Sequence, residues 1–491
     1  MKKLLISFLL STLFVNGFSQ ELSFADPLGD HMVVQQNKPF KVWGKAAAGE
    51  EVIISADWLS AEVTVRAKEN GDFIGMVSVP AIDRGDFSKH WISISSHGEE
   101  KKLEDILIGD VWICSGQSNM QFSLDESVNG QEEVARADHP NMRLFYAGLN
   151  FSNEPLMDIS GEWQVCDSTS AKKFSAVAYF FGTKLQEELE SPVGIVFTGI
   201  GASAAQAYVP QQVLAADSVL NTTYLQPYLQ SEKSREKIDG GFTFEKVTRP
   251  FLLYNALIHS LTNLSVSGFC WYQGESNRHE RSEYTHLMYQ MIGSWREAFA
   301  QGNLPFYYVQ VAPYFYDMED PTLADYAFFR EAQEAISALG NTEMVVTMDV
   351  GEAKDLHPKN KKPIGIRLAR TALNRHYGFL EIGYQGPTFQ SVDFEEDEAI
   401  VTFTPESVKR GLSTNDGQPP RHFQLAGEDH TFYPAEAEIF GNQVRVQSKQ
   451  VKNPVAVRYA FTNYPVTNLE NGEAIPALPF RSDDWPEPPV K

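Results

Sequence analysis

The sequence is poor in features that mark several large classes of protein. It has only three cysteines, Cys114, Cys166 and Cys270, in 491 residues. Cys114 and Cys270 lie inside apolar runs, which predicts buried, unpaired thiols. One disulfide remains compatible with this count, whereas a fold held together by disulfides is excluded. Past the first 20 residues, no apolar run is long enough to cross a membrane.

Basic residues are scarce relative to acidic ones. The chain has 41 Lys and Arg against 64 Asp and Glu, a formal net charge of −23. Nucleic acids and anionic membrane surfaces bind clustered cations, so we expect neither as a partner. A strongly negative charge is also what keeps many exported proteins soluble. The composition gives no signal for an oligomeric state.

Motifs for metals and nucleotides are missing as well. The chain has no H-E-x-x-H pair, no Cys-His cluster and no EF-hand loop. It also lacks the glycine-rich motifs that cradle phosphate groups. We therefore expect no metal and no other cofactor.

The N-terminus resembles an export signal. Lys2 and Lys3 precede the apolar run Leu4–Val15, and small residues follow up to Gln20. This run is too short to span a bilayer, so residues 1–20 are predicted to be a cleaved signal peptide. No cysteine lies at the junction, which argues against a lipid anchor. The expected location is periplasmic or extracellular.

Two β-rich segments flank a central segment of different character. The length of 491 residues predicts roughly two to four domains, and a hydrophobic content of 43% is enough for a globular core. Residues 21–105 show short alternating runs and predict an N-terminal β-sandwich-like domain, with a hairpin turn at Asn70-Gly71. Residues 386–491 predict a C-terminal β domain, with a second hairpin turn at Gly441-Asn442.

Residues 106–385 alternate between strand and helix patterns. Helical spacing of apolar residues occurs near 174–189, near 287–299 and after residue 357. This alternation predicts an α/β domain whose parallel sheet is covered by helices on both faces. Residues 125–170 fit no period, and we expect a long surface excursion there. Apolar strand candidates lie at Asp110–Cys114, Val193–Thr198, Gly268–Tyr272, Phe306–Ala312 and Met344–Met348.

Ser118 follows the first of these strands. The run Val111–Cys114 ends in Ser-Gly, and Gln117, Ser118 and Asn119 come next. Open α/β sheets bind ligands at the carboxyl ends of their strands, so a serine hydroxyl here is a candidate nucleophile. The alternative is a turn serine that caps the next helix.

The loop after the second strand offers a rival serine. Gly201-Ala202-Ser203-Ala204-Ala205 loosely imitates the G-x-S-x-G nucleophile elbow but ends in Ala205. We interpret its small residues instead as allowing a backbone N–H, that of Gly201, to approach a substrate oxygen. Asn277, after the third strand, can donate a side-chain N–H to an oxyanion, although Asn is also a common loop residue.

His357 is the preferred base among 11 histidines. It follows the last strand and directly precedes Pro358, which keeps it extended and outside the next helix. Asp355 can orient its Nδ1–H so that Nε2 faces Ser118. An ordinary surface Asp–His pair is the alternative.

Four ordered blocks resemble those of SGNH-type hydrolases, and most closely the sialate O-acetylesterase group. The blocks are GQSNM at 116–120, GIGASAAQAY at 199–208, WYQGESN at 271–277 and DLHPKNK at 355–361. Segments at 43–52, 423–437, 453–461 and 479–485 resemble the flanking domains of the same group. The resemblance implies a three-layer, flavodoxin-like parallel-sheet core between two β domains.

The resemblance also implies the roles of site residues. Ser118 is then the nucleophile, His357 the general base, and the oxyanion hole consists of the N–H groups of Ser118 and Gly201 with the Asn277 side chain. Nearby polar residues that could support the site are Gln117, Gln273 and Glu275. The group commonly has Asp three residues before the His, where this chain has Lys354. The identity of the acid partner of His357 is therefore open: Asp355 is the first candidate, Asp349 the second, and a Ser–His dyad without an acid the third.

The expected reaction is hydrolysis of O-acetyl esters through a serine acetyl-enzyme. Sialic acid is the first substrate candidate, and Arg278 could pair with its carboxylate. Acetylated xylan or another acetylated glycan is the alternative, and it needs no such cation. A glycan-binding protein with an inactive core is the alternative from another class.

Overall fold

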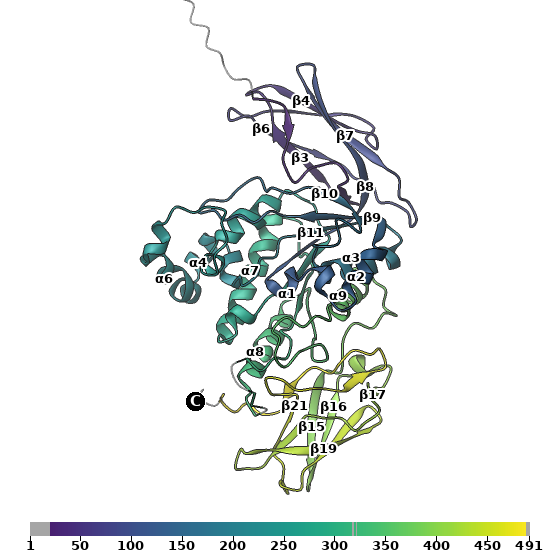
Figure 1. Ribbon diagram of the computed structural model, residues 1–491, viewed down its shortest axis with the longest axis vertical. Coiled ribbons are helices and arrows are strands. Elements are labelled where there is room, and N and C mark those ends of the chain that lie inside the picture. Colours follow the sequence, from purple (N-terminus) through teal and green to yellow (C-terminus); the bar gives the residue numbers. More distant parts are fainter. Residues whose placement is uncertain (1–19, 317–318, 321, 488–491) are drawn as a thin grey trace, which may run out of the picture.

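The computed structural model describes residues 20–316, 319–320 and 322–487. The predicted signal peptide therefore lies outside the described residues, apart from Gln20. Figure 1 shows three parts along the long axis: N-terminal strands at one end, an α/β core in the middle and C-terminal strands at the other end.

The N-terminal part consists of strands, as expected. One sheet has the order β1-β3-β6, and in the other β5, β4, β7 and β8 pair in turn. Gly71 forms the predicted turn with φ 81°. The predicted hairpin is wrong, however, because β5 pairs with β4 whereas β6 pairs with β3. The strands are β1 (Ser23–Phe24), β2 (Val33–Gln35), β3 (Phe40–Lys45), β4 (Glu51–Ala56), β5 (Val63–Arg66), β6 (Asp72–Val77), β7 (His90–Ser96) and β8 (Glu99–Gly116).

Strand β8 connects this part to the core. Its first half pairs with β7 and its second half lies in the middle of the core sheet. The core order is β10-β9-β11-β8-β12-β13-β14. The further strands are β9 (Asp138–Tyr146), β10 (Trp163–Asp167), β11 (Val193–Phe197), β12 (Gly268–Tyr272), β13 (Phe306–Val309) and β14 (Thr342–Val345).

The five core strands expected from the sequence are all present and parallel. Among these five, the spatial order is β11-β8-β12-β13-β14. In chain order this is second, first, third, fourth, fifth. The carboxyl ends of β8, β11 and β12 consequently lie side by side, and the three loops that follow them meet there.

Helices cover both faces of the sheet (Figure 1). Helices α3 (Ala176–Leu189) and α9 (Lys362–Arg375) pack in one apolar cluster with Trp112 and Cys270. Helices α7 (Ser282–Phe299) and α8 (Asp325–Glu334) contribute to the cluster on the other face. Three of these helices, α3, α7 and α9, were predicted from their apolar spacing. Shorter helices include α1 (Ser118–Gln121), α2 (Gly130–Arg136), α4 (Gln211–Ala216), α5 (Ser218–Leu220) and α6 (Gln226–Gln230).

The prediction of a surface excursion at 125–170 was wrong. This segment contains β9 and β10, which extend the core sheet beyond β11. Arg143 interrupts the apolar pattern of β9, yet it is only 1% exposed because Asp105 pairs with its guanidinium at 3.2 Å. Because a charged residue in the middle of β9 is buried, the sequence pattern did not predict β9 as a core strand.

In the described residues of the C-terminal part, the regular elements are strands and one short 3-10 turn, Pro405–Val408. Its main sheet has the order β15-β16-β20-β19-β18-β21-β23. Gly441-Asn442 makes the predicted hairpin between β19 and β20. The strands are β15 (Phe389–Glu395), β16 (Glu398–Phe403), β17 (Leu412–Thr414), β18 (Phe423–Ala426), β19 (Phe432–Phe440), β20 (Gln443–Gln447), β21 (Ala456–Tyr459), β22 (Leu469–Asn471) and β23 (Phe480–Arg481).

Three expectations from composition can be compared with the structure. All three cysteines are free and buried. Within the described residues, no helix has the length and apolar character needed to span a membrane. The same part of the chain contains no group of three or more His, Cys, Asp or Glu placed to hold a metal ion.

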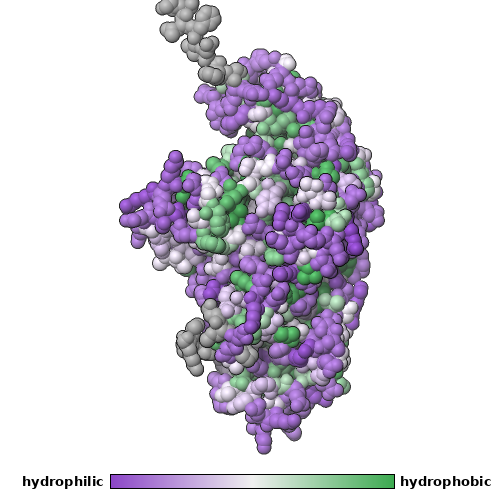
Figure 2. Space-filling model, viewed as in Figure 1, coloured by the Kyte–Doolittle hydropathy of each residue, from purple (hydrophilic) through white to green (hydrophobic). Residues whose placement is uncertain are grey.

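The face shown in Figure 2 is mainly hydrophilic, with apolar side chains gathered in the hollow beside the projection that carries α4 and α6.

Candidate functional site

Ser118 begins helix α1 directly after the end of β8. The turn into this helix needs a glycine at 116, where φ is 140° and an added Cβ would lie 2.2 Å from the Tyr272 carbonyl oxygen. Gln117 N–H then donates to that same carbonyl oxygen at 2.9 Å. The half-buried Ser118 is therefore held at the sheet edge by the close approach of β8 and β12.

His357 is brought to Ser118 by the loop that precedes α9. Its Nε2 lies 2.7 Å from Ser118 Oγ, within hydrogen-bond distance. His357 lies outside α9, as expected, but the helix begins at Lys362, four residues after Pro358, and not at Pro358 itself. The two residues that head the predicted site are thus in direct contact.

The acid partner is less closely placed. Asp355 Oδ1 lies 3.9 Å from His357 Nδ1, which is too long for a hydrogen bond. The same oxygen instead accepts the His357 backbone N–H at 2.9 Å. Asp349 forms a paired contact with Arg367, at 2.8 and 2.6 Å. Asp355 is therefore the acid beside His357, and it acts on the imidazole by charge rather than by a hydrogen bond.

Burial and charge act together on the His357 imidazole. Burial lowers its pKa, the positive charge of Lys361 lowers it further, and the Asp355 carboxylate raises it. The net direction is downward from the ordinary histidine value. A neutral imidazole with a free Nε2 lone pair is the form that accepts a proton from a serine hydroxyl.

Gly201 lies immediately above the serine. A Cβ added to Gly201 would be 3.7 Å from Ser118 Cβ. The backbone N–H of Gly201 donates to Gln121 Oε1 at 2.7 Å, and Gln121 Nε2 donates to the Tyr146 hydroxyl at 3.2 Å. The next residue, Ala202, has φ 60°, a strained value for a residue with a side chain. Gly201 thus lies close to the nucleophile, and its N–H is bound to the Gln121 amide oxygen.

Ser203 is fully buried, and its hydroxyl contacts the Gly116 carbonyl and the Tyr208 hydroxyl. It therefore has no access to a substrate.

Asn277 is 2% exposed and has four side-chain contacts. Its Nδ2 donates to Gln206 at 3.1 Å and to Glu280 at 2.9 Å. Its Oδ1 accepts from the Ala205 N–H and from Gln273 Nε2. Donation to an oxyanion therefore requires that one of the two Nδ2 contacts be exchanged.

The three supporting residues named from the sequence all link loops of the site. Gln117 Oε1 accepts the backbone N–H of Gly274 at 3.2 Å. Gln273 Nε2 donates to Asn277 Oδ1, and Gln273 Oε1 accepts a hydrogen bond from the Tyr284 hydroxyl. Glu275, 4% exposed, accepts the Asn119 side-chain amide at 2.6 Å, and burial raises its pKa.

Sequence reasoning missed two buried residues here, Asn119 and Lys361. Lys361 Nζ donates to Asn119 Oδ1 at 2.5 Å, and neither residue has any exposed surface. One signal for Lys361 was available, because it is the N-cap of α9, where the positive end of the helix dipole disfavours a cation. Asn119 carried no signal of its own beyond its place next to Ser118.

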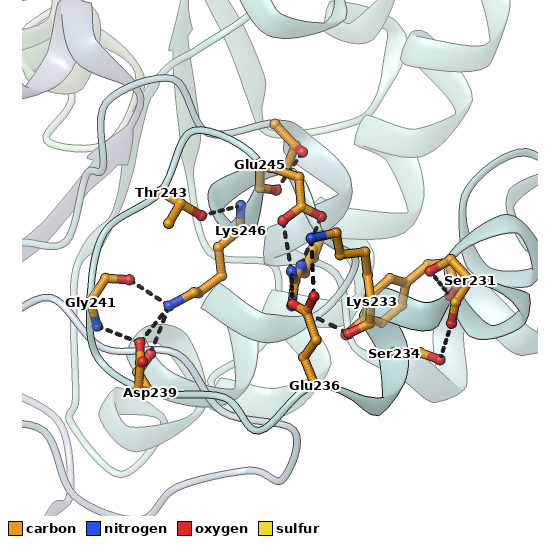
Figure 3. A network of polar contacts seen from close by, with 12 residues as sticks. Ser231, Lys233, Ser234, Glu236, Asp239, Gly241, Thr243, Glu245 and Lys246 are labelled. Carbon is orange, nitrogen blue, oxygen red and sulfur yellow. Dashed lines mark hydrogen bonds and ion pairs between the residues drawn. The ribbon is translucent and has the colours of Figure 1, made fainter.

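A segment of residues 231–249, called the bracing segment here, contacts the Gly201 loop from outside. The Val247 carbonyl accepts the Ala204 N–H, and the Thr248 carbonyl accepts Gln206 Nε2. Figure 3 shows the polar network within the bracing segment, in which Lys246 donates to Asp239 and to the Gly241 carbonyl. Arg249, 4% exposed, pairs with Glu236 and Glu245. Two buried cations, Lys246 and Arg249, thus pair with exposed carboxylates of the bracing segment itself.

Comparisons with known proteins identify the family of the chain. Residues 108–374 match the family described as "Carbohydrate esterase, sialic acid-specific acetylesterase". The sialate O-acetylesterase of Mus musculus is 26% identical and covers 93% of each chain. The Homo sapiens sialate O-acetylesterase is 25% identical over 93% of this chain and 92% of its own.

A solved structure extends the likeness to all three parts of the molecule. The crystal structure of a carbohydrate acetylesterase from Xanthomonas citri superposes with a TM-score of 0.83 at 31% sequence identity. The match covers 94% of this chain and 100% of that one. The flanking β parts therefore belong to the shared architecture.

Proposed function

Because this chain belongs to the carbohydrate esterase family of sialic acid-specific acetylesterases, we propose that it removes O-acetyl groups from sugars through an acetyl-enzyme on Ser118. The protein is a carbohydrate O-acetylesterase by its family and by relatives that match it over nearly their whole length. The observation that carries the serine mechanism is the 2.7 Å contact between Ser118 Oγ and His357 Nε2.

In the first half of the reaction, Ser118 Oγ attacks the acetyl carbonyl carbon. Its proton passes to His357 Nε2, which lies within hydrogen-bond reach. The imidazolium then gives this proton to the sugar oxygen as the ester bond breaks, and the acetyl group stays on Ser118. The Asp355 carboxylate, 3.9 Å from Nδ1, favours the imidazolium while it exists.

In the second half, a water molecule takes the place of the sugar. His357 accepts a proton from this water, which attacks the acetyl-serine carbonyl carbon. The proton returns to Ser118 Oγ as the acyl bond breaks, and acetate leaves. The protein needs no cofactor for either half.

The tetrahedral intermediates carry a negative oxygen. The proposed donors to it are the backbone N–H groups of Ser118 and Gly201 and the Asn277 side chain. Gly201 is the best supported of these donors. A Cβ added to it would lie 3.7 Å from Ser118 Cβ, and its N–H already donates to an amide oxygen. Gln121 must withdraw that oxygen before the substrate oxygen can replace it.

For the substrate we propose an O-acetylated sialic acid. Arg278 follows Asn277 and is half-buried, with its guanidinium carbon 4.3 Å from the centre of the Tyr316 ring. A guanidinium packed over a ring retains N–H groups that can bind a carboxylate in bidentate fashion. Acetylated xylan offers no carboxylate at the acetylated sugar.

Two structural proposals accompany the function. The core is proposed to be an SGNH-type, flavodoxin-like domain over 106–385, between β domains at 21–105 and 386–491, and the strand order β11-β8-β12-β13-β14 supports this. Residues 1–20 are proposed to direct export, on the basis of Lys2, Lys3 and the apolar run that follows.

The decisive experiment measures acetate release by the wild type and Ser118→Ala from O-acetylated sialic acid and acetylated xylan. We expect the wild type to act on the sialic acid ester and Ser118→Ala to retain only background. Arg278→Ala should weaken hydrolysis of the sialic acid ester while leaving p-nitrophenyl acetate hydrolysis within about twofold. Near-normal esterase activity of Ser118→Ala would refute the assignment of Ser118 as the nucleophile. An equal loss of activity of Arg278→Ala on the sialic acid ester and on p-nitrophenyl acetate would refute the role of Arg278.

A further inference from the structure

The side chain of Asn119, next to the nucleophile, joins three loops of the site. Its Nδ2 donates to Glu275 Oε1 at 2.6 Å and to the Leu356 carbonyl oxygen at 3.1 Å. Its Oδ1 accepts from Lys361 Nζ at 2.5 Å. Glu275 follows β12, and Leu356 and Lys361 belong to the segment that carries His357. One buried amide therefore uses all of its hydrogen-bonding groups to connect the Ser118 and His357 loops.

Lys361 is an unusual residue to find at this position. Its side chain is fully buried and its Nζ lies 4.9 Å from the centre of the Phe122 ring and 5.6 Å from that of Tyr272. A buried ammonium group is costly unless it is hydrogen-bonded and compensated by a negative charge. The compensating charge is Glu275, on the other side of the Asn119 amide. Glu275 Oε2 has no hydrogen-bond partner within the described residues.

The Ser118–His357 pair needs such a connection, because no carboxylate among the described residues is hydrogen-bonded to the His357 ring. The Asp355 contact to Nδ1 is 3.9 Å long. Backbone contacts hold the His357 loop: the Leu356 carbonyl accepts from Asn119, the His357 N–H donates to Asp355, and the Lys359 carbonyl accepts the Val128 N–H. The Asn119 contact is the one that joins this loop directly to the residue next to Ser118.

We propose that Lys361 is a positioning residue of the esterase, which through Asn119 and Glu275 clamps the His357 loop to the Ser118 loop. This inference rests on the proposed roles of Ser118 and His357. Lys361 touches neither substrate nor the reacting atoms; it fixes the Asn119 amide, and Asn119 fixes Leu356.

The charge of Lys361 gives the clamp a second effect. Burial lowers the pKa of Lys361 to about 7, while Glu275, Asp355 and Glu352 raise it. Below that pH the side chain is a cation, and this cation lowers the pKa of His357. Removing the charge should therefore raise the pKa of His357, and the acid limb of the rate profile should move to higher pH. Tyr272 is the other ionisable group against the ammonium, and burial keeps its phenol neutral.

The test compares Lys361→Met with Lys362→Met in the full chain. Lys362 is the matched control, because it is the next residue, carries the same charge and pairs with Glu133 on the surface at 56% side-chain exposure. The measurements are kcat and KM for p-nitrophenyl acetate across pH, with thermal unfolding of each variant. Lys361→Met should lower kcat about 10- to 100-fold with little change in KM, the effect expected when a catalytic group is slightly misplaced. Its acid limb should lie at higher pH, and Lys362→Met should match the wild type.

Asn119→Ala removes the hydrogen bond to Leu356 but keeps the charge of Lys361, so it separates these two effects. It also tests the proposal if Lys361→Met does not fold. It should lower kcat to a similar extent without moving the acid limb toward higher pH. A folded Lys361→Met or Asn119→Ala protein with wild-type kcat overturns the proposal, as does an unmoved acid limb in Lys361→Met. Ser118→Ala, measured beside them, reports separately on the proposed function: if it stays active, the serine mechanism fails whatever Lys361 does.

Discussion

The Nε2 atom of His357 lies 2.7 Å from the Oγ atom of Ser118, although 239 positions of the chain separate the two residues. Both residues follow strands of the same sheet: Ser118 follows β8 in the middle of the sheet, and His357 follows β14 at its edge. The loop of residues 346–361 covers the lateral distance between those strands. Several consequences of this arrangement can be measured.

The first concerns the acid beside His357. Asp355→Ala should lower kcat far less than the ~10⁴-fold that follows disruption of a directly hydrogen-bonded triad aspartate. The reason is the 3.9 Å separation from Nδ1, which leaves only a charge effect and the bond to the His357 N–H. Steady-state kinetics with p-nitrophenyl acetate measure the loss, and His357→Ala serves as the reference for full loss of the base.

Asp349→Asn is the comparison for the second acid candidate. Its carboxylate is paired with Arg367, which is 6% exposed. Weakening that pair should lower the melting temperature and leave kcat of the folded protein near the wild-type value. A loss of kcat in Asp349→Asn as large as that in His357→Ala would move the acid role from Asp355 to Asp349.

The second prediction is a pH profile. His357 must be neutral to accept the Ser118 proton, so activity rises as pH passes its pKa. Burial and Lys361 together hold that pKa below the ordinary value of 6.5. The acid limb of kcat/KM should therefore have its midpoint below 6.5. A midpoint above that value would mean that the imidazole is stabilised as a cation in the free enzyme.

Part of this site could be predicted from the sequence for a simple reason. Ser118, Gly201 and Asn277 each follow an apolar run, and parallel strands end at one edge of a sheet. That rule places loops together without any knowledge of packing. His357 was chosen on the same ground, with Pro358 as local support.

The rest depends on contacts that no local pattern encodes. Gln121 and Tyr146 meet only because β9 joins the sheet beside β11, and β9 itself was hidden by the buried Arg143. Asn119 and Glu275 were visible as polar residues, but Lys361, which donates to Asn119, is 242 positions from it. Which polar groups pair inside a core is decided by the packing of loops.

The third prediction concerns Gln121, whose amide oxygen lies on the Gly201 N–H at 2.7 Å. A substrate oxyanion must displace it, and a hydrogen bond of this kind contributes about 0.5–1.5 kcal/mol. Gln121→Ala should therefore raise kcat/KM for p-nitrophenyl acetate by about 2- to 10-fold. Gln131→Ala, an exposed glutamine of α2, is the control and should not change the rate. A fall of about 10²–10³-fold in Gln121→Ala would instead show that Gln121 itself stabilises the oxyanion.

The last prediction separates stability from catalysis at the junction between the core and the C-terminal strands. Asn463, 2% exposed, accepts the Tyr326 N–H at 2.9 Å and donates to Asp325 at 2.7 Å, both at the start of α8. Asn463→Ala leaves a buried N–H without its acceptor, which should lower the free energy of unfolding by about 1–3 kcal/mol.

Chemical denaturation measures that loss, and kcat for p-nitrophenyl acetate should stay within about twofold of the wild type, because Asn463 contacts no residue of the Ser118–His357 pair. Asn442→Ala, in the exposed hairpin turn, is the control for an asparagine outside the junction. A folded Asn463→Ala protein with strongly reduced kcat would show that the C-terminal strands also set the geometry of the catalytic loops.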